Sequence, residues 1–420
     1  MANINRGNPI KSKSVITILF EFMLGVWFVL PLIIFRPFKE IYFAPLRTDR
    51  IGHFIQDTEI LIAQINSEST KRKKNILVFW FCSSIISNMY VYSIWNSILR
   101  VIAYSRISSA IYSTAVVVEK ICKIKLTFRH KTYDDLYSYV YLLEQCAPVF
   151  GMPHEDSEEC KNILKSVGID TSLNWVCILN RDQGYLRHMY PHLDWEFNEY
   201  RNSNIETYVS AAEYLAEKKI MIFRMGSHVE KSFSSSNSTM LIDYANCSWR
   251  TEKLDIYLTS RCLFMVSSGT GLDAVAVALR KPLLMVNSTQ PLNLYKSKSQ
   301  HIIIFKKFLD KKTGNYLSPT QYYHMGIKYG FTVDNQLHLR SQDLVKLEIE
   351  VVDNTQEEIR EAVEEMYQLI TNKNQFNENF SKQQIKFWEN FPKIGLYLND
   401  SQVNCKVGDK FLANNQWLLH

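Results

Sequence analysis

The chain has 420 residues, enough for two or three domains, which excludes a small module held together by disulfides. Hydrophobic residues make up 46% and charged residues 21%, with 14 glycines and 11 prolines, so the composition excludes a disordered or fibrous protein. Residues 1–150 carry 18 lysines and arginines against 10 acidic residues, whereas residues 151–420 carry 30 against 32. No basic run is interleaved with aromatic residues as in a nucleic-acid groove, so the basic first third favours an anionic membrane surface as partner, with an ordinary solvated face as the alternative.

An apolar segment, residues 15–35, lies between basic flanks near the beginning of the chain. It is 21 residues long with one charged residue, Glu21, and is therefore long enough to span a bilayer. The internal carboxylate and the basic residues on both flanks argue against a simple span. Three interpretations of this segment stay open: an interfacial or re-entrant anchor, a transmembrane helix, and a helix buried in the fold. We expect residues 1–38 to be a membrane-associating segment.

The next elements predict a first lobe of the nucleotide-binding α/β type. Residues 41–46 predict a buried strand, residues 47–53 a loop with a glycine, and a helix follows through Asn66. A second apolar strand at 75–82 precedes a mostly helical stretch. We assign residues 39–150 to this lobe and expect it to hold the acceptor of a reaction.

A polar stretch at residues 152–160 interrupts the apolar pattern, and strand–helix alternation restarts at Trp175. The expected strands are 175–180, 220–224, 240–243, 262–266 and 282–286, with helices at 204–218, 254–261 and 272–279. Short apolar strands separated by helices of roughly ten residues predict a parallel, doubly wound sheet. We assign residues 151–372 to this second lobe.

The end of the second lobe carries a helix-capping pattern. Thr355 and Glu358 have capping-box spacing, and the helix they open has one apolar face. That face consists of Ile359, Ala362, Val363, Met366 and Leu369. Residues 373–420 are expected to form a helical tail, with packing back on the first lobe as one arrangement.

The motif that most clearly indicates a binding site follows the strand at 262–266. It consists of small residues with hydroxyl groups or no side chain, namely Ser267, Ser268, Gly269, Thr270 and Gly271. In an open α/β sheet, ligands bind past the carboxyl ends of the strands, where helix amino-termini and turn amides donate to phosphate. No lysine follows the second glycine, so the turn is not a P-loop. It predicts a phosphate site, with an ordinary capped turn as the alternative.

Charged residues follow two other strands of this lobe. Arg181 stands after the strand at 175–180 and has the bidentate geometry for a phosphate, while Asp182 is placed to hold its guanidinium. A surface ion pair is the alternative for this pair. Asp243 ends another strand and is a candidate for lining the same site.

The loop after the first strand is the place in the first lobe where an acid and a histidine are close together on a glycine turn. Asp49 and His53 are the residue types that remove a proton from a hydroxyl group. His53 is the first choice of base, because histidine titrates near neutral pH. A structural histidine is the alternative.

The sequence gives little support for a metal site or for disulfides. The eight cysteines form no C-x-x-C pair and several lie in apolar runs, which favours buried free thiols in a reducing compartment. His188 and His192 have metal-ligand spacing with Asp194 nearby, but Pro191 between them disfavours the helix such a site needs. We expect no metal and no cofactor.

Several motifs occur together in one order, and they carry a resemblance. They are RDQGYL (181–186), YRNSNIETY (200–208), FRMG (223–226), IDYA (242–245), DIYLTSRCLFMVSSGTGLD (255–273) and DNTQEEIREAVEEM (353–366). The chain thereby resembles a family of bacterial glycosyltransferases found with surface-polysaccharide genes, and RIGHF (50–54) is similar to that family's first-lobe loop. More distantly, its arginine and Ser/Gly/Thr turn are similar to the donor lobe of fucosyltransferase-like GT-B enzymes.

The resemblance implies a GT-B fold, that is, two Rossmann-like lobes whose parallel sheets face each other across a cleft. It implies that Arg181, Ser268, Gly269 and Thr270 bind the donor phosphates without a metal. The implied activity is transfer of a hexosyl or deoxyhexosyl group from a nucleotide-sugar to a saccharide or polyprenyl-diphosphate-linked acceptor. The implied pathway is surface polysaccharide or lipopolysaccharide biosynthesis.

These expectations place the protein at the cytoplasmic face of a bacterial inner membrane, peripheral or anchored by residues 15–35, with no nucleic-acid partner. Two alternatives stay open. One is a nucleotide-sugar epimerase on the same fold, and the other is a non-catalytic subunit of polysaccharide assembly. The sugar, the nucleotide base, the stereochemical course and the oligomeric state are not predicted.

Overall fold

The structure is a computed structural model that describes residues 15–35, 38–72, 76–129, 139–189, 191–234, 239–289, 301–329, 332–333, 336–337, 339–372, 381–390 and 405–419. The chain divides into two compact units, residues 1–151 and 152–420. The polar stretch 152–160 stands at this division. It does not form a linker, because it opens helix α6 (His154–Ser166) with Glu155 and Asp156 in the first turn, where carboxylates favour a helix.

The first unit is built on a small parallel sheet. Strands β1 (Glu40–Leu46), β2 (Ile76–Cys82) and β3 (Arg100–Ile102) lie in the order β1-β2-β3. On the other side of β1, Phe43 forms a parallel bridge with Thr127. The strands expected at 41–46 and 75–82 are confirmed, whereas β3 is too short and too exposed to carry a sequence pattern.

Helices of the first unit follow each strand. Their bounds are η1 (His53–Asp57, a π-helical turn), α2 (Thr58–Arg72), α3 (Met89–Ile98), α4 (Arg106–Cys122) and η2 (Val140–Gln145). Asn88 and Ser105 cap α3 and α4 by accepting from the backbone N–H groups of Val91 and Ser108. The helix predicted after the first strand is confirmed and is longer than expected, since α2 continues to Arg72.

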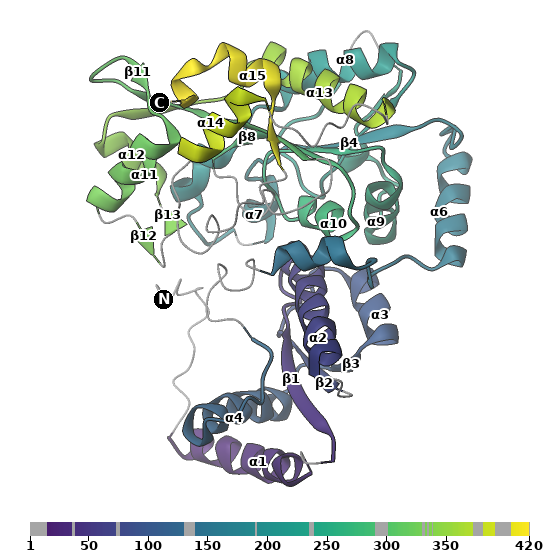
Figure 1. Cartoon of the computed structure of the whole chain (residues 1–420). Helices are drawn as coiled ribbons and strands as arrows, with labels where there is room; N and C mark the ends of the chain where they lie inside the picture. Colours follow the sequence, from purple (N-terminus) through teal and green to yellow (C-terminus); the bar gives the residue numbers. More distant parts are fainter. Residues whose placement is uncertain are drawn as a thin grey trace. The chain divides into compact units, whose positions relative to one another are not determined.

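The apolar segment forms helix α1 (Val15–Ile34), which packs lengthwise on α4 (Figure 1). Gly25 makes this contact possible, because a Cβ there would lie 2.1 Å from the Thr114 hydroxyl oxygen and 3.0 Å from the Ala110 carbonyl oxygen. Val29 then reaches a core that includes Phe43 and Phe81 of the sheet. Among the helices that the structure describes, none has the length and apolarity of a membrane-crossing helix.

The second unit contains a seven-stranded sheet in which all strand pairs are parallel, in the order β15-β9-β8-β7-β4-β5-β6. The strands are β4 (Trp175–Leu179), β5 (Met221–Arg224), β6 (Leu241–Ile242), β7 (Met265–Ser267), β8 (Leu283–Ser288), β9 (His301–Phe305) and β15 (Lys406–Val407). The five strands expected in this unit are present. The predicted α/β class with parallel sheets is therefore confirmed.

Helices cover both faces of this sheet. Helices α8 (Val209–Glu217) and α13 (Gln356–Thr371) pack together against β5 and β8, and α9 (Glu252–Arg261) and α10 (Asp273–Ala278) pack against β4 and β7 (Figure 1). The shorter turns are α7 (Gly184–Met189), η3 (Glu196–Arg201), η4 (Ile205–Tyr208) and η5 (Tyr244–Asn246).

The capping pattern predicted for α13 is confirmed. The Thr355 hydroxyl accepts from the Glu358 N–H at 3.1 Å, and the Glu358 carboxylate accepts from the Thr355 N–H at 2.9 Å. The predicted apolar face of this helix is buried. At the helix expected from residue 204, the Asn204 side chain accepts from the Glu206 N–H, and one 3₁₀ turn precedes α8.

A second, smaller sheet and the tail complete the unit. The smaller elements are β10 (Lys307–Asp310), β11 (Asn315–Tyr316), α11 (Pro319–Lys328), β12 (Thr332–Val333), β13 (Gln336–Leu337), α12 (Ser341–Lys346) and β14 (Ile349–Val352). The tail contains α14 (Lys382–Asn390), α15 (Asp409–Asn414) and η7 (Gln416–Leu419). The tail belongs to the second unit, where β15 extends the second sheet beside β9 and α15 packs on α13, and its packing back on the first lobe stays a prediction.

All eight cysteines are free thiols, as expected. Five of them are buried, whereas Cys122 and Cys146 are exposed. Burial raises the pKa of the Cys82 and Cys160 thiols to about 11, so these side chains stay protonated and behave as small apolar residues.

Candidate functional site

The strand order of the second unit places its ligand site between β4 and β7. From β4, the chain adds β5 and β6 on one side, and β7, β8 and β9 extend the sheet on the other side. The crevice beyond the carboxyl ends of the strands is where open α/β sheets bind ligands, at the point where the order reverses. Arg181 follows β4 and the Ser267–Gly271 turn follows β7. The two motifs singled out in this lobe therefore flank the switch point.

Arg181 and the Ser267–Gly271 turn are in direct contact. The Arg181 backbone N–H donates to the Ser268 hydroxyl at 2.7 Å, and the Ser268 N–H donates to the Leu179 carbonyl at 3.2 Å. Gly269 has φ +87°, a conformation that favours glycine over other residues. Gly271 lies exposed in the following turn. The backbone thus fixes the position of Arg181 relative to the turn.

The Asp273 side chain binds the Ser267–Gly271 turn from its inner side. Its carboxylate accepts from the Thr270 N–H at 2.8 Å and from the Ser267 hydroxyl at 3.0 Å, and the Gly269 N–H donates to the Ser267 hydroxyl at 3.2 Å. Burial raises the pKa of Asp273 to about 6, and the bonds from Thr270 and Ser267 oppose that rise. Two turn amides expected to face a phosphate are therefore bonded to the protein itself. The positive charge of the site comes mainly from side chains.

Two further cations stand near this turn. Lys306 directly follows β9, is buried, and donates to the Asp353 carboxylate at 2.6 Å and to the Asn202 carbonyl. Burial lowers the pKa of the Lys306 ammonium, and the positive charge of Arg181 lowers it further. The Asp353 carboxylate raises this pKa and so opposes both effects. Arg201 acts on Asp273, since its charge lowers the pKa of that carboxyl. Arg181, Arg201 and Lys306 therefore form a cationic group around the switch point.

A buried polar network supports this end of the sheet. Asn287 and Asn354 exchange hydrogen bonds, each backbone N–H donating to the other's side-chain oxygen at 2.6 Å. Tyr208 is fully buried, which raises its pKa, and hydrogen bonds with Ser203, Asn287 and Ser268 oppose that rise. Because these bonds join loops at this end of the sheet to one another and to β8, the network holds the loops in place.

Asp182, which was expected to hold Arg181, and Asp243, which was expected to line the site, have one partner in common. Both bind Arg224, a fully buried arginine that ends β5, at 3.7 Å for Asp182 and 3.1 Å for Asp243. Asp182 also accepts from the Gly184 and Glu230 N–H groups, and Asp243 accepts from the Phe233 N–H. Among the ion pairs of described residues, Asp182 pairs with Arg224 and not with Arg181. The two carboxylates thus neutralise a buried cation and fix loops.

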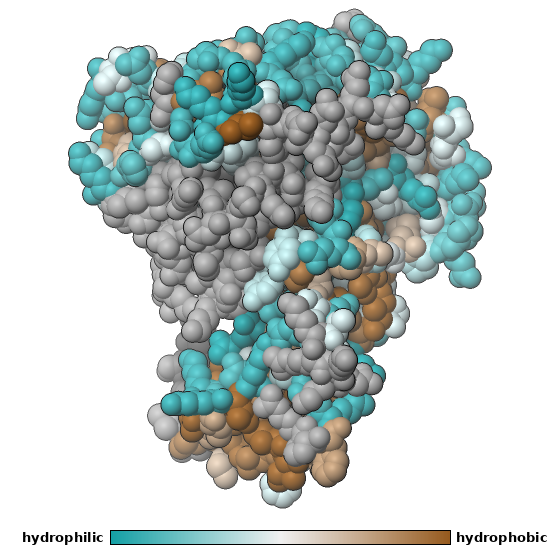
Figure 2. All heavy atoms as spheres, in the orientation of Figure 1, coloured by the Kyte–Doolittle hydropathy of each residue, from teal (hydrophilic) through white to brown (hydrophobic). Residues whose placement is uncertain are grey.

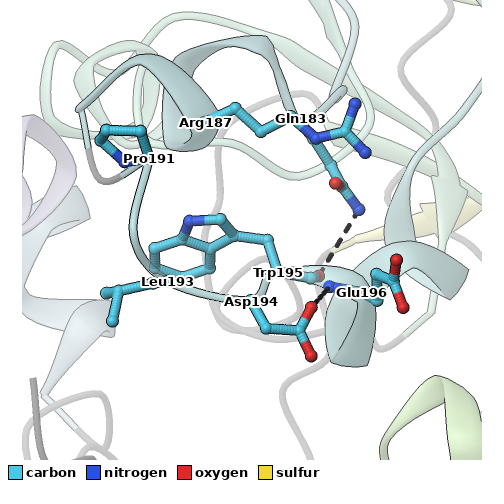
Figure 3. Close-up of a pocket in the computed structure, with 7 residues that line it drawn as sticks. All are labelled: Gln183, Arg187, Pro191, Leu193, Asp194, Trp195 and Glu196. Atoms are coloured by element: carbon cyan, nitrogen blue, oxygen red, sulfur yellow. Dashed lines mark hydrogen bonds between the residues drawn. The ribbon is translucent and has the colours of Figure 1, made fainter.

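A cavity of about 340 Å³ lies beside α7, in the segment that follows Arg181 and Asp182. Figure 3 shows the Trp195 ring in its wall, together with Gln183, Arg187, Pro191, Leu193, Asp194 and Glu196. Asp194 accepts from the Glu196 N–H at 2.8 Å, and Arg187 pairs with Glu230 at 2.7 Å. An aromatic face together with carboxylates and a guanidinium suits a polar ligand with some apolar surface.

His188 and His192 are not brought together as metal ligands. The His188 ring stacks on the His228 ring, with centroids 3.6 Å apart. Burial lowers the pKa of His228, and the nearby His188 adds to that effect. In the described part of the chain no group of three or more metal-ligating side chains is present.

In the first unit, the loop after β1 brings His53 against a carboxylate. The His53 Nδ1 atom lies 3.1 Å from an Asp57 oxygen, and the Arg47 guanidinium lies 3.5 Å from the same oxygen. Asp57 is almost fully buried, whereas His53 is partly open to solvent. A buried carboxylate on Nδ1 leaves Nε2 as the nitrogen that can accept a proton, which is the arrangement of an oriented general base.

The carboxylate beside His53 is Asp57, which no sequence pattern indicated. His53 and Asp57 are four residues apart and lie in the π-helical turn η1, a geometry common at functional sites. The turn is held by its neighbours, since the Phe54 carbonyl accepts from the Thr58 hydroxyl at 2.8 Å and from the Trp95 indole at 3.0 Å. Asp49 lies upstream in the turn before this helix.

Two other residues of the site that were not predicted share one signal. Lys306 directly follows an apolar strand and Arg224 ends one. A charged residue at the carboxyl end of a buried strand is unusual enough to search for. Arg201 lies in a polar stretch and carries no such signal.

Comparison with known proteins gives distant structural likenesses only. No protein-family model and no curated protein matches the sequence. ADP-heptose lipopolysaccharide heptosyltransferase II of Escherichia coli is similar at 11% identity and a TM-score of 0.43, over 79% of this chain and 99% of that one. A family 9 glycosyl transferase from Veillonella parvula is similar at 8% identity and a TM-score of 0.40, over 73% and 95%.

A third solved structure, the iron-containing dodecameric glycosyltransferase TibC of enterotoxigenic E. coli, is similar at 10% identity and a TM-score of 0.38, over 80% of this chain and 77% of that one. These TM-scores and identities are low. The functional assignment therefore rests on the residues of this chain, and the fucosyltransferase-like resemblance stays a prediction.

Proposed function

We propose that this protein is a glycosyltransferase of the GT-B type that moves a sugar from a nucleotide-sugar to a lipid-linked or saccharide acceptor. The observation that carries the proposal is the contact between Arg181 and the Ser267–Gly271 turn at the switch point of a parallel sheet. Nucleotide diphosphates are the ligands that such a site suits, because a fixed guanidinium and hydroxyl groups converge where α/β sheets bind them.

The second unit would bind the donor. Arg181, Lys306 and Arg201 supply positive charge that balances the diphosphate, which becomes the leaving group when the bond to the anomeric carbon breaks. Because side chains supply this charge, we propose that the reaction needs no metal. The cavity lined by Trp195 is the candidate for the sugar or the base.

The first unit would supply the general base. His53 Nε2 accepts the proton of the acceptor hydroxyl as that oxygen attacks the anomeric carbon, and Asp57 stabilises the imidazolium that forms. A base of this kind serves a transfer that inverts the anomeric centre. We propose the inverting course for that reason, and we propose hexose or deoxyhexose as the sugar.

We propose further that the acceptor is a polyprenyl-diphosphate saccharide of surface-polysaccharide biosynthesis at the cytoplasmic face of an inner membrane. The support is the basic charge of the first unit and the apolar helix α1 that belongs to it. A lipid-linked diphosphate is anionic and lies at such a surface.

The experiment is a panel of nucleotide-sugars tested first for thermal stabilisation of the protein and then for transfer in the presence of chelator. Stabilisation by one nucleotide class, followed by transfer to a saccharide or lipid-linked saccharide, supports the proposal. A new sugar formed from the donor alone identifies an epimerase instead. Donor binding with no product under any acceptor condition identifies a non-catalytic subunit.

A further inference from the structure

The outer faces of α1 and α4 form one exposed apolar surface in the first unit. On α1, Met23, Trp27 and Ile34 are 66%, 79% and 71% exposed, and they repeat at helical spacing. On α4, Ile121 is 71% exposed. Figure 2 shows apolar residues gathered at the lower end of the view, where Figure 1 labels α1 and α4. Leu19, Phe20, Phe28 and Leu30 of α1 and Ile107 and Val117 of α4 are also exposed.

The inner faces of the same two helices are fixed to the protein. Val29 of α1 and Ala115 of α4 share a core cluster with the strand residue Phe43, and Gly25 lets the helices approach closely. Only the outer stripe of α1 is therefore available to a partner. A helix with one face on protein and one apolar face outward has the geometry of a helix lying in a membrane interface.

The charges around this surface have one sign. Between residues 19 and 39 and between 103 and 123, the exposed charged side chains that the structure describes are Lys39, Arg106, Lys120 and Lys123. The acidic residue of α4, Glu119, is turned inward, where it accepts from the Leu126 and Thr127 N–H groups at 2.9 and 2.7 Å. Glu21 of α1 is half-buried.

This pattern favours anionic lipid over a second copy of the chain. In a two-fold dimer the same patch meets itself, which brings lysines and arginines toward one another. An anionic bilayer surface instead attracts them, and its interface accepts Trp, Tyr and Phe side chains. The exposed aromatic residues of α1, which are Phe20, Trp27 and Phe28, suit that region.

We propose that the outer faces of α1 and α4 together form a docking surface for an anionic lipid bilayer, in which both helices lie along the membrane plane. Trp27 and Met23 enter the acyl boundary from α1, and Ile121 enters it from α4. Lys120, Lys123 and Arg106 contact lipid headgroups at the edge. The inference rests on the membrane location proposed above and names its surface, adding α4 to the apolar segment found in the sequence.

The test is co-sedimentation of the full chain with vesicles of phosphatidylcholine alone or mixed with phosphatidylglycerol, with no nucleotide-sugar present. The wild-type protein should bind the anionic vesicles, and less so at high salt. Trp27→Asp and Ile121→Asp should each lower the partition coefficient about tenfold, because an apolar anchor is lost and a like charge is added. Lys120→Gln combined with Lys123→Gln should lower binding to anionic vesicles and leave binding to neutral ones unchanged.

Val345→Asp is the matched control, because Val345 is an aliphatic side chain in the second unit and is 75% exposed. It should bind vesicles as the wild type does. Absence of vesicle binding by the wild type, or equal binding by Trp27→Asp and the control, would overturn the inference. A wild-type dimer that Trp27→Asp converts to a monomer, without vesicle binding, would assign the surface to self-association instead. Nucleotide-sugar binding by the same variants reports separately on the proposed function.

Discussion

At the scale of single residues, function depends on which charged groups the fold brings together. Arg181 and Ser268 could be predicted because each stands in a loop directly after a strand, and His53 because it follows a glycine near the first strand. Lys306 and Arg201 were not predicted, because their partners are distant in sequence. Asp57 was not predicted, because no pattern indicates the π-helical turn that places it beside His53. The contact of Arg224 with Asp182 and Asp243 likewise appears only when three strand ends are placed side by side.

The pair of His53 and Asp57 predicts a graded loss of activity. His53→Ala should lower kcat by about 10²–10⁴, because the acceptor proton loses its base. Asp57→Asn should lower kcat less, on the order of tenfold, since the imidazole remains and only its orientation and the charge behind it change. Steady-state kinetics measures both effects, and donor affinity should stay unchanged because the donor residues are in the other unit.

Asp49→Asn is the comparison for this prediction, since Asp49 lies in the same loop and is the carboxylate that the sequence favoured. It should keep more activity than Asp57→Asn. If Asp49→Asn loses as much kcat as His53→Ala while Asp57→Asn is near normal, the orienting role belongs to Asp49. If His53→Ala keeps normal turnover, the base lies elsewhere or the transfer retains configuration.

The cationic group at the switch point predicts a loss of donor binding. Arg181→Ala should weaken nucleotide-sugar binding by about 2–4 kcal/mol, as expected when a charge-assisted partner is lost from a desolvated site. Calorimetric titration of the folded variant measures the change. Lys311→Ala removes an exposed lysine that pairs with Glu350, and it should leave affinity unchanged. Unchanged affinity in Arg181→Ala would remove this arginine from the donor site.

At the scale of elements, apolar pattern and capping predicted most of the helices and strands. The strands β1, β2 and β4 and the cap of α13 were found because each is long or carries a reciprocal hydrogen-bonding signature. The short strands β3, β11, β12, β13 and β15 were not predicted, because two or three residues carry no period, whereas the short strands β6 and β7 were found from the longer apolar runs that contain them. The pairing of the tail with β9 was not predicted, since only the two residues of β15 form it.

The packing of α1 on α4 predicts that Gly25 cannot be enlarged. In Gly25→Val, the new side chain would meet Thr114 and the Ala110 carbonyl, so the two helices must separate. The free energy of unfolding should therefore fall by about 1–3 kcal/mol. Chemical denaturation followed by circular dichroism measures this loss. Gly151→Val is the control, because a Cβ there meets nothing within 4 Å. Equal stability of the two variants would contradict the tight packing.

At the scale of the whole molecule, the chain is two α/β units, each with its own parallel sheet and core. The class could be predicted because alternating strands and helices have few other solutions. The facing of the two sheets across a cleft stays a prediction, because it depends on contacts between distant surfaces that no local pattern carries. The division of labour between donor and acceptor units is a proposal for the same reason.

The stability of the second unit should decline as pH rises through the neutral range. Burial raises the pKa of Glu365 to about 7, and the negative charge of Asp409 raises it further. The Asp409 N–H, which donates to the Glu365 carboxylate at 2.8 Å, lowers this pKa and so opposes the rise. The ordinary value is 4.5, so the folded state holds a proton that the unfolded chain has released. The stabilising contribution is therefore full below about pH 4.5 and is lost as pH rises through about 7.

Replacing Glu365 with glutamine tests this step. The amide is neutral at every pH and keeps an oxygen for the Asp409 N–H, so Glu365→Gln should match the wild type near pH 4.5 and exceed its unfolding free energy by about 2–3 kcal/mol at pH 8. Thermal unfolding across this pH range measures the difference. Glu350→Gln removes an exposed carboxylate paired with Lys311 and should change stability by less than about 0.5 kcal/mol. If the unfolding free energy of Glu365→Gln depends on pH as that of the wild type does, the Glu365 carboxylate is already ionised in the folded protein. The polar groups around α13 and residue 409 would then have to solvate that charge.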